Sequence, residues 1–459
     1  MGKYFGTDGF RGEAGVTLTA DHAYLLGRIL GWYCREHDLC LPSDTRIEPH
    51  RPRVVVGKDT RRSGYMLEYA LAAGLAASGA DVYMLHVITT PGVSFITERE
   101  GFDCGVMISA SHNPFSDNGI KLVNRRGEKI DDDAIAVIEA YLDGAVEGLP
   151  LATGEDVGRV IDYVAGRNRY VGHLISLAAH AYKGMRVGLD CANGSVWMMG
   201  RVIFEALGAE TVVTGDTPDG LNINVDCGST HIEHLKRLVI EQHLDVGFAF
   251  DGDADRCIAV DEKGNEVNGD HILYILGKAM KEQEALAGNT VVTTIMSNMG
   301  LYRALEAAGI DYVQTTVGDR FVYENMLENG YVLGGEQSGH IILRKYATTG
   351  DGLLTAIMVM ERMAESGLPL SGLAEAVVMY PQVTRNLPVP DKDAVLSHPA
   401  VQERLAEINT RLGSGGRMLL RPSGTEPVVR VMVEAADAET CEALASEMID
   451  LIKREGLAR

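Results

Sequence analysis

The chain has 459 residues, 46% of them apolar and 23% charged, which is enough for about three domains of roughly 150 residues with large buried cores. This composition excludes a disordered, collagen-like or coiled-coil protein. Sixty-four acidic residues against 42 basic ones leave a net charge of −22, which argues against binding to nucleic acid or to an anionic membrane. An anionic ligand would therefore need a few local basic loops.

The seven cysteines are scattered and include no C-x-x-C pair, so neither a disulfide framework nor a thiolate zinc site is expected. The N-terminus lacks a basic and apolar signal region, and the longest apolar stretch is interrupted by Asp81 and His86. We therefore expect a soluble cytoplasmic protein.

A strand–helix–strand plan occurs three times along the chain. Its predicted elements are, in chain order, strand 53–57, helix 64–77 and strand 81–86; strand 185–189, helix 196–207 and strand 210–214; strand 289–293, helix 300–308 and strand 310–315. Such βαβ units favour a mixed, mostly parallel sheet with helices packed on it. The copies are a domain apart, so the sequence predicts three related α/β domains.

The end of the chain follows a different plan and predicts a smaller α+β domain. A helix at 397–412 precedes strands at 417–420 and 428–434, and Asp437 caps a final amphipathic helix. Glycine and proline accumulate near residues 144–158 and 367–390, where we expect linkers. The predicted domains are 1–153, 154–258, 259–370 and 371–459; the boundary after 258 rests on the repeat spacing alone.

Three carboxylates alternate in Asp251-Gly-Asp253-Ala-Asp255, directly after an apolar strand. At this spacing they emerge on one side of an extended strand end and can enclose a hard cation. A solvated acidic turn is the alternative, although mutual repulsion disfavours it. An EF-hand is supported by Glu262 at loop position 12, but Arg256 stands where that loop needs glycine. Few ligands and an anionic substrate favour Mg²⁺ over Ca²⁺.

Ser111 and His112 follow another apolar strand, and Asn113-Pro114 bends the chain after them. A Ser-His dipeptide is weak evidence for a catalytic pair, because neighbouring residues on a strand point apart. A serine beside a metal site is, however, suited to carry a phosphoryl group, and Lys121 could balance its charge.

Four loops combine small residues with arginine, as a phosphate site requires. They are residues 6–12 with Arg11, 57–63 with Arg61 and Arg62, 318–320 with Arg320, and 421–427 with Arg421. A turn with a solvated arginine is the alternative for each, and the last loop is the strongest because it lies between two strands. The chain lacks a Walker A loop and a G-x-G-x-x-G motif, so nucleotide and dinucleotide cofactors lose support.

Residues 334–340 place a carboxylate, an amide, a hydroxyl and an imidazole between glycines. Such a loop could bind the hydroxyl or amino groups of a sugar. A plain surface turn is the alternative, and His340 could instead be a satisfied structural histidine.

Together and in this order, the motifs resemble those of the α-D-phosphohexomutase superfamily over essentially the whole chain. The resemblance implies four domains, with Ser111 as the phosphorylated serine and one Mg²⁺ held by Ser111, Asp251, Asp253 and Asp255. The implied catalytic residues are Ser111, His112, Lys121, Arg256, His340 and Arg11. The implied substrate-binding residues are Arg320, Glu336, Ser338, Arg421, Ser423, Gly424, Thr425 and Arg430.

Gln337 and residues 221–231 are similar to the subgroup that acts on glucosamine phosphates. The resemblance then implies interconversion of glucosamine 6-phosphate and glucosamine 1-phosphate, through a phosphoserine and a 1,6-bisphosphate, for UDP-N-acetylglucosamine synthesis. Glucosamine or glucose 1,6-bisphosphate would be the primer. The general acid and base would come from four candidates, with the first two favoured: His340, Lys121, His112 and Arg11.

Other functions stay open at this point. A phosphomannomutase or phosphoglucomutase of the same superfamily is the first alternative. Asp251 and Asp253 could instead form the aspartyl-phosphate site of a haloacid-dehalogenase-type phosphatase, although Asp255 stands where that pattern has threonine. A non-catalytic sugar-phosphate sensor is the third. The expected partner is a small hexosamine phosphate, with neither nucleic acid nor membrane, and a homodimer is an open option.

Overall fold

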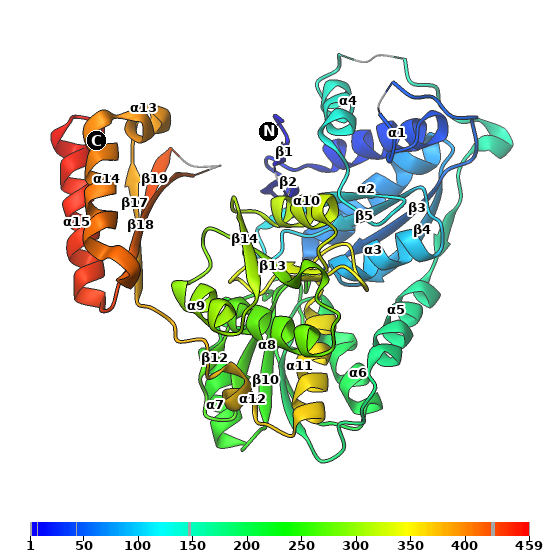
Figure 1. Cartoon of the computed structure of the whole chain (residues 1–459). Helices are drawn as coiled ribbons and strands as arrows, with labels where there is room; N and C mark the ends of the chain where they lie inside the picture. The colour runs from blue at the N-terminus through cyan, green and yellow to red at the C-terminus, as the bar shows by residue number, and fades with distance from the viewer. Residues whose placement is uncertain (1, 7, 43, 146–147, 424–426, 459) are drawn as a thin grey trace. The chain divides into compact units, whose positions relative to one another are not determined.

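The computed structural model describes residues 2–6, 8–42, 44–145, 148–423 and 427–458. They form two compact units (Figure 1), one of Met1–Met296 and Ile310–Glu375 and the other of Ser297–Gly309 and Ala376–Arg459. Within the described residues, no helix combines the length and the apolar character needed to cross a membrane.

The first sheet has the strand order β1-β2-β6-β5-β3-β4-β7, parallel from β5 to β7 and antiparallel from β5 to β1. Its strands are β1 (Phe5–Gly6), β2 (Gly9–Glu13), β3 (Arg53–Lys58), β4 (Asp81–Val87), β5 (Cys104–Ile108), β6 (Asp117–Asn124) and β7 (Val160–Asp162). Its helices are α1 (Ala20–Glu36), α2 (Arg62–Ala77), α3 (Thr90–Arg99) and α4 (Asp132–Leu142). The centre is buried on both faces, which is why β3 and β5 are nearly continuous apolar runs.

The second and third sheets repeat this mixed pattern, with orders β12-β11-β10-β8-β9 and β14-β13-β15-β16. The second sheet has β8 (Arg186–Asp190), β9 (Glu210–Thr214), β10 (Val246–Phe250), β11 (Cys257–Asp261) and β12 (Glu266–Val267). The third has β13 (Thr290–Thr294), β14 (Asp311–Thr315), β15 (Leu333–Gly335) and β16 (Ile341–Leu343). The helices are α5 (Val164–Leu177), α6 (Gly200–Ala206), α7 (Glu233–Glu241), α8 (Gly269–Glu282), α10 (Asp319–Asn329), α11 (Gly352–Ser366) and α12 (Leu370–Ala374).

The second unit contains an antiparallel sheet of order β17-β19-β18 with α14 and α15 on one face (Figure 1). Its elements are α9 (Met299–Ala307), β17 (Gln382–Pro388), α13 (Lys392–Ser397), α14 (Pro399–Leu412), β18 (Arg417–Pro422), β19 (Val428–Glu434) and α15 (Ala438–Arg454). Asp437 caps α15 by accepting from Thr440 N at 2.7 Å. One face of α15 is buried, at Cys441, Leu444, Ala445, Met448 and Ile452, as its helical periodicity predicts.

The three predicted βαβ units and the α+β end are confirmed, but strands cross the predicted boundaries. β7 pairs with β4 of the first sheet, although it lies after residue 153. β11 spans the boundary at 258 and pairs with β10, so the second sheet continues to β12. The linker expected at 367–390 contains α12 and β17. In the second βαβ unit, the start of the predicted helix 196–207 is a short 3₁₀ helix, Ser195–Met198, which precedes α6.

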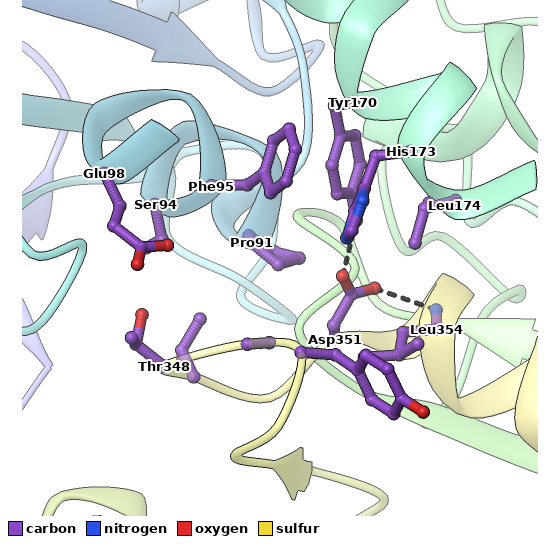
Figure 2. Close-up of a pocket in the computed structure, with 13 residues that line it drawn as sticks. Pro91, Ser94, Phe95, Glu98, Tyr170, His173, Leu174, Thr348, Asp351 and Leu354 are labelled. Carbon is purple, nitrogen blue, oxygen red and sulfur yellow. Dashed lines mark hydrogen bonds between the residues drawn. The ribbon is translucent and has the colours of Figure 1, made fainter. Parts of the chain in front are cut away.

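Asp351 caps α11 from a buried position against α5 (Figure 2). Its carboxylate accepts from Leu354 N at 3.0 Å and from the Tyr170 hydroxyl at 2.7 Å. Burial raises the pKa of Asp351 to about 6 in spite of these donors. The folded chain therefore binds this proton more tightly than the unfolded chain does.

We expect the substitution Asp351→Asn to make stability less dependent on pH. The stability that the raised pKa of Asp351 contributes is full below about pH 4 and is lost as the pH rises to about 6, an effect of about 3 kcal/mol. Asparagine can keep the cap without ionising. The difference in unfolding free energy, variant minus original chain, should therefore rise by about 3 kcal/mol between pH 4 and pH 7. Urea titration at each pH would measure it. A difference that stays constant with pH would contradict this explanation.

Candidate active site

Ser111 lies in the loop after β5, and its backbone is left-handed with φ 53°. The side chain is buried, and its hydroxyl donates to Asp251 Oδ2 at 2.5 Å. These two residues are 140 positions apart in the chain, so the two loops that the sequence predicts to converge do so. Left-handed non-glycine residues collect at functional sites, where the surrounding structure must hold them in place.

The loop between β10 and β11 carries the three aspartates. All three are buried, and one carboxylate oxygen from each lies within 4.8 Å of the others. Gly252 brings this loop against the serine loop, because a Cβ added there would lie only 2.5 Å from Ser111 O. A side chain at residue 252 would therefore push the two loops apart.

The aspartate cluster fits a divalent cation. Three buried carboxylates at this distance repel one another unless a cation lies among them. Asp253 Oδ1 and Asp255 Oδ1 are buried and accept no hydrogen bond from the part of the chain that the structure describes. An all-oxygen donor set with few protein ligands is what Mg²⁺ prefers beside a phosphate. Asp251, Asp253 and Asp255 therefore fit the predicted Mg²⁺ ion.

Lys121, on β6, is the nearest cation to this cluster. Its Nζ lies 2.8 Å from Asp253 Oδ2, 3.3 Å from Asp255 Oδ2 and 3.2 Å from Asp8 Oδ2. Burial opposes its charge, but these three carboxylates outweigh burial and raise the pKa of Lys121 well above its usual value. Lys121 is therefore protonated at neutral pH in this arrangement.

A second lysine extends the charge network to the third sheet. Lys129 Nζ lies 3.0 Å from Asp8 Oδ1 and 2.7 Å from Asp319 Oδ2, at the start of α10. His340 Nε2 lies 3.5 Å from Asp319, and His340 Nδ1 lies 3.7 Å from Asp255. The alternation of lysine, carboxylate and imidazole links β6, which carries Lys121, with the loop of the three aspartates and the loop of His340.

The pKa values of Asp251 and Asp255 are shifted in opposite directions. Burial and repulsion from Asp255 and Asp253 raise the pKa of Asp251 well above its usual range. Burial also opposes ionisation of Asp255, but Lys121 and His340 outweigh it and hold its pKa well below that range. A cation bound at the cluster would favour the ionised form of all three groups.

His112 contacts the hydroxyl of Ser111, and Arg256 and Arg11 contact the loop that carries this serine. His112 Nδ1 lies 3.3 Å from Ser111 Oγ and 3.3 Å from an Arg256 guanidinium nitrogen. Burial and the two arginines lower the pKa of His112 to about 4, so its ring is neutral at neutral pH. Arg11 donates to Asn113 Oδ1 at 3.3 Å. The predicted catalytic residues around Ser111 thus lie together.

The predicted sugar-binding residues lie between β15 and β16, and not all of them are free. Glu336 accepts from Gly318 N at 3.1 Å, whereas Ser338 is exposed. The ring of His340 is buried, and its Nε2 accepts from Gly350 N at 3.0 Å. His340 therefore has a hydrogen-bond partner of the kind expected for a structural histidine, which is the alternative to a role in binding sugar. Arg320 binds Asp132 of α4 through two bonds of 2.6 and 3.1 Å.

The predicted phosphate loop of the second unit is described only in part. Arg421 of β18 and Arg430 of β19 are cross-strand partners, an arrangement of like charges that an anion would stabilise. Ser423 is buried, and its carbonyl accepts from Lys392 at 2.7 Å. Gly424 and Thr425 lie outside the described residues.

Several residues at the site have no predicted role. Thr90, at the start of α3, donates to Asp253 Oδ2 at 2.6 Å and thereby orients this carboxylate. Asp8 forms ion pairs with Lys121 and Lys129, and Lys129 lies in no sequence motif. Arg61 is buried, and its guanidinium donates to loop carbonyls, so the expected role of the 57–63 loop in binding phosphate is wrong for Arg61.

Models of the phosphoglucomutase/phosphomannomutase domains match nearly the whole chain. Alpha/beta/alpha domain I matches residues 2–147, domain II 168–264, domain III 268–380 and the C-terminal domain 385–451. The chain belongs to the phosphoglucomutase/phosphomannomutase family. Membership of this family confirms the predicted fold class of three α/β domains and a small C-terminal domain.

Individual relatives agree with the family. A phosphoglucosamine mutase of Lachnospira eligens is 58% identical over 458 residues, covering 100% of each chain. A phosphoglucomutase/phosphomannomutase family protein of Burkholderia thailandensis has a similar structure, with TM-score 0.79 and 24% identity over 99% of this chain and 98% of that one. Aspergillus fumigatus N-acetylphosphoglucosamine mutase, solved with GlcNAc-6P and magnesium, has TM-score 0.69 and 17% identity over 98% and 95%. The two structures support the fold.

Proposed function

We propose that this chain interconverts glucosamine 6-phosphate and glucosamine 1-phosphate through a phosphoserine at Ser111 and a 1,6-bisphosphate. The observation that carries the proposal is the contact of 2.5 Å between the Ser111 hydroxyl and the buried aspartate cluster. A hydroxyl there can carry a phosphoryl group beside the cation that neutralises its charge.

The transfer conserves phosphate over one cycle. The bond between phosphorus and Ser111 Oγ breaks while a bond forms between phosphorus and the free sugar hydroxyl oxygen. The sugar hydroxyl loses one proton and Ser111 Oγ gains one, so protons balance. The bisphosphate then turns, and Ser111 receives the other phosphate in the reverse reaction. The first phosphorylation of Ser111 needs a 1,6-bisphosphate primer, of glucosamine or glucose.

The residues of the site divide this work. Asp251, Asp253 and Asp255 would hold Mg²⁺, which supplies neutralisation of the phosphoryl charge when bound. Lys121 and Arg256 add fixed positive charge next to the same group.

Two further sets of residues bind the rest of the substrate in this proposal. Arg421, Ser423 and Arg430 bind the phosphate that is not transferred, because paired guanidinium groups suit a phosphate. Glu336 and Ser338 bind sugar hydroxyls. The choice of glucosamine is supported by the relative that is 58% identical over the full length.

A substrate comparison tests this function. Glucosamine, glucose and mannose 6-phosphates would be supplied with Mg²⁺ and glucose 1,6-bisphosphate, and the 1-phosphates followed by phosphorus NMR. We expect glucosamine 6-phosphate to have the highest kcat/KM, by about tenfold or more, a preference of at least 1.4 kcal/mol. A higher value for mannose 6-phosphate would refute the glucosamine preference. Phosphate found on Asp251, with none on Ser111, would refute the mutase mechanism and favour a phosphatase.

A further inference from the structure

Arg61 lies at the start of α2 and is wholly buried, at 0% exposure. One terminal nitrogen donates to Ser111 O at 2.9 Å and to Asn113 O at 2.8 Å. The other donates to Asp117 O at 3.0 Å and to Pro114 O. The Arg61 side chain therefore donates hydrogen bonds to four backbone carbonyl groups in and next to the loop that carries Ser111.

The same network reaches the other side of Ser111. Arg61 Nε donates to Asp59 Oδ2 at 2.8 Å, and Ser109 Oγ donates to the same oxygen at 2.7 Å. Ser109 Oγ in turn accepts from Ser111 N at 2.9 Å. The amide and the carbonyl of Ser111 are thus held by one connected set of buried groups.

Asn224 holds the loop from the side of the second sheet. Its side-chain amide donates to Ser111 O at 2.9 Å and to Asn113 O at 3.2 Å. Its own backbone is left-handed, with φ 59°, and its N–H donates to Ala192 O at 2.9 Å. Ser111 O therefore accepts from Arg61, at the start of α2, and from Asn224, in the segment between β9 and α7.

These contacts matter because Ser111 is left-handed, a conformation that L-residues adopt only when their surroundings impose it. We infer that Arg61 and Asn224 are positioning residues that hold the backbone of Ser111 so that its hydroxyl stays aligned for phosphoryl transfer. The inference deepens the proposed function and rests on Ser111 as the phosphoryl carrier. A small displacement of a reacting atom is enough to lower a rate about 100-fold.

Two conservative substitutions test this inference. Arg61→Lys keeps the charge but offers one nitrogen in place of a planar fork, and Asn224→Asp puts an oxygen where the amide donates. The matched controls are Arg28→Lys and Asn222→Asp. Arg28 is also a buried arginine, which donates to the carbonyls of Leu149 and Pro150. Asn222 is an asparagine two positions from Asn224 that donates to Thr217 O.

Two readouts that do not depend on the sugar substrate would be measured for each variant: hydrogen exchange of the peptide covering residues 109–118, and the rate at which glucose 1,6-bisphosphate phosphorylates Ser111, followed by intact mass. Steady-state turnover of glucosamine 6-phosphate is the third readout. We expect both test variants to exchange faster in this peptide and to phosphorylate Ser111 about 10- to 100-fold more slowly. With glucosamine 6-phosphate, kcat should fall while KM stays within about threefold. The control variants should match the original chain within about twofold in kcat.

The outcomes separate this inference from the proposed function. Unchanged exchange of residues 109–118 in both test variants, or faster exchange with an unchanged rate of Ser111 phosphorylation, overturns the inference. An equal loss of rate in Arg28→Lys also overturns it, because the effect would then be general destabilisation. If the original chain phosphorylates Ser111 but does not convert glucosamine 6-phosphate, only the choice of substrate fails, and the two readouts still decide the positioning role.

Discussion

Replacing Ser111 with alanine is expected to lower kcat by about 10⁴-fold or more, because the atom that carries the phosphoryl group is removed. The remaining charges, Lys121 and Arg256, can still bind phosphate, so KM should change much less than kcat. Mutase activity would be measured with glucosamine 6-phosphate, Mg²⁺ and a 1,6-bisphosphate. Intact mass would show no added phosphate on the variant.

The control for this variant is Ser116→Ala. Ser116 is an exposed serine in the same loop, five positions further on, and its carbonyl rather than its side chain bonds to Ala14. This variant should keep its phosphorylation and its kcat within about twofold, as exposed substitutions usually do. A Ser111→Ala protein with more than about one hundredth of the original kcat would show that another group carries the phosphate.

Replacing Asp253 with asparagine is expected to lower kcat by about 10³-fold and to weaken Mg²⁺ binding. The substitution removes one of three charges from the cation site and also breaks the 2.8 Å ion pair with Lys121. Charge stabilisation by a bound cation is worth several kcal/mol, and about 1.4 kcal/mol corresponds to tenfold in rate. Calorimetric titration with Mg²⁺ alone would measure the affinity, and steady-state turnover the rate.

Asp261→Asn is the matched control for this second variant. Asp261 is a buried aspartate at the far end of β11 from the cluster, where it accepts from Asn265 N at 2.8 Å. Its Mg²⁺ affinity and kcat should stay near those of the original chain. If Asp253→Asn kept the Mg²⁺ affinity and lost less than tenfold in kcat, the aspartate cluster would not be the catalytic cation site.

The parts of the fold that the sequence predicts are those with strong local signals. β3 and β10 are apolar runs because they are buried on both faces, and Asp437 marks the start of α15 by its capping bond. β7 and β17 were not predicted, since both are edge strands with exposed or polar residues and little apolar periodicity. Edge strands become recognisable only through the neighbour with which they pair.

The candidate site divides in the same way. Ser111 and the three aspartates are predictable because each group directly follows an apolar strand, where loops of an α/β fold carry chemistry. Lys129 is not, because its position depends on Asp319, 190 residues further along the chain. The role of Arg61 is likewise set by packing, since an arginine in a loop of small residues looks the same whether it binds phosphate or backbone carbonyls.

A single turnover of the chain that carries radiolabelled phosphate on Ser111 tests the phosphoserine mechanism. The labelled protein, in excess, would be mixed with unlabelled glucosamine 6-phosphate and Mg²⁺, quenched at short times and digested, and the label on the Ser111 peptide measured. We expect the label to leave Ser111 at least as fast as kcat and to appear first in a bisphosphate and then in glucosamine 1-phosphate, while unlabelled phosphate returns to Ser111. Label that stays on Ser111 while glucosamine 1-phosphate accumulates would show that Ser111 does not carry the transferred phosphate.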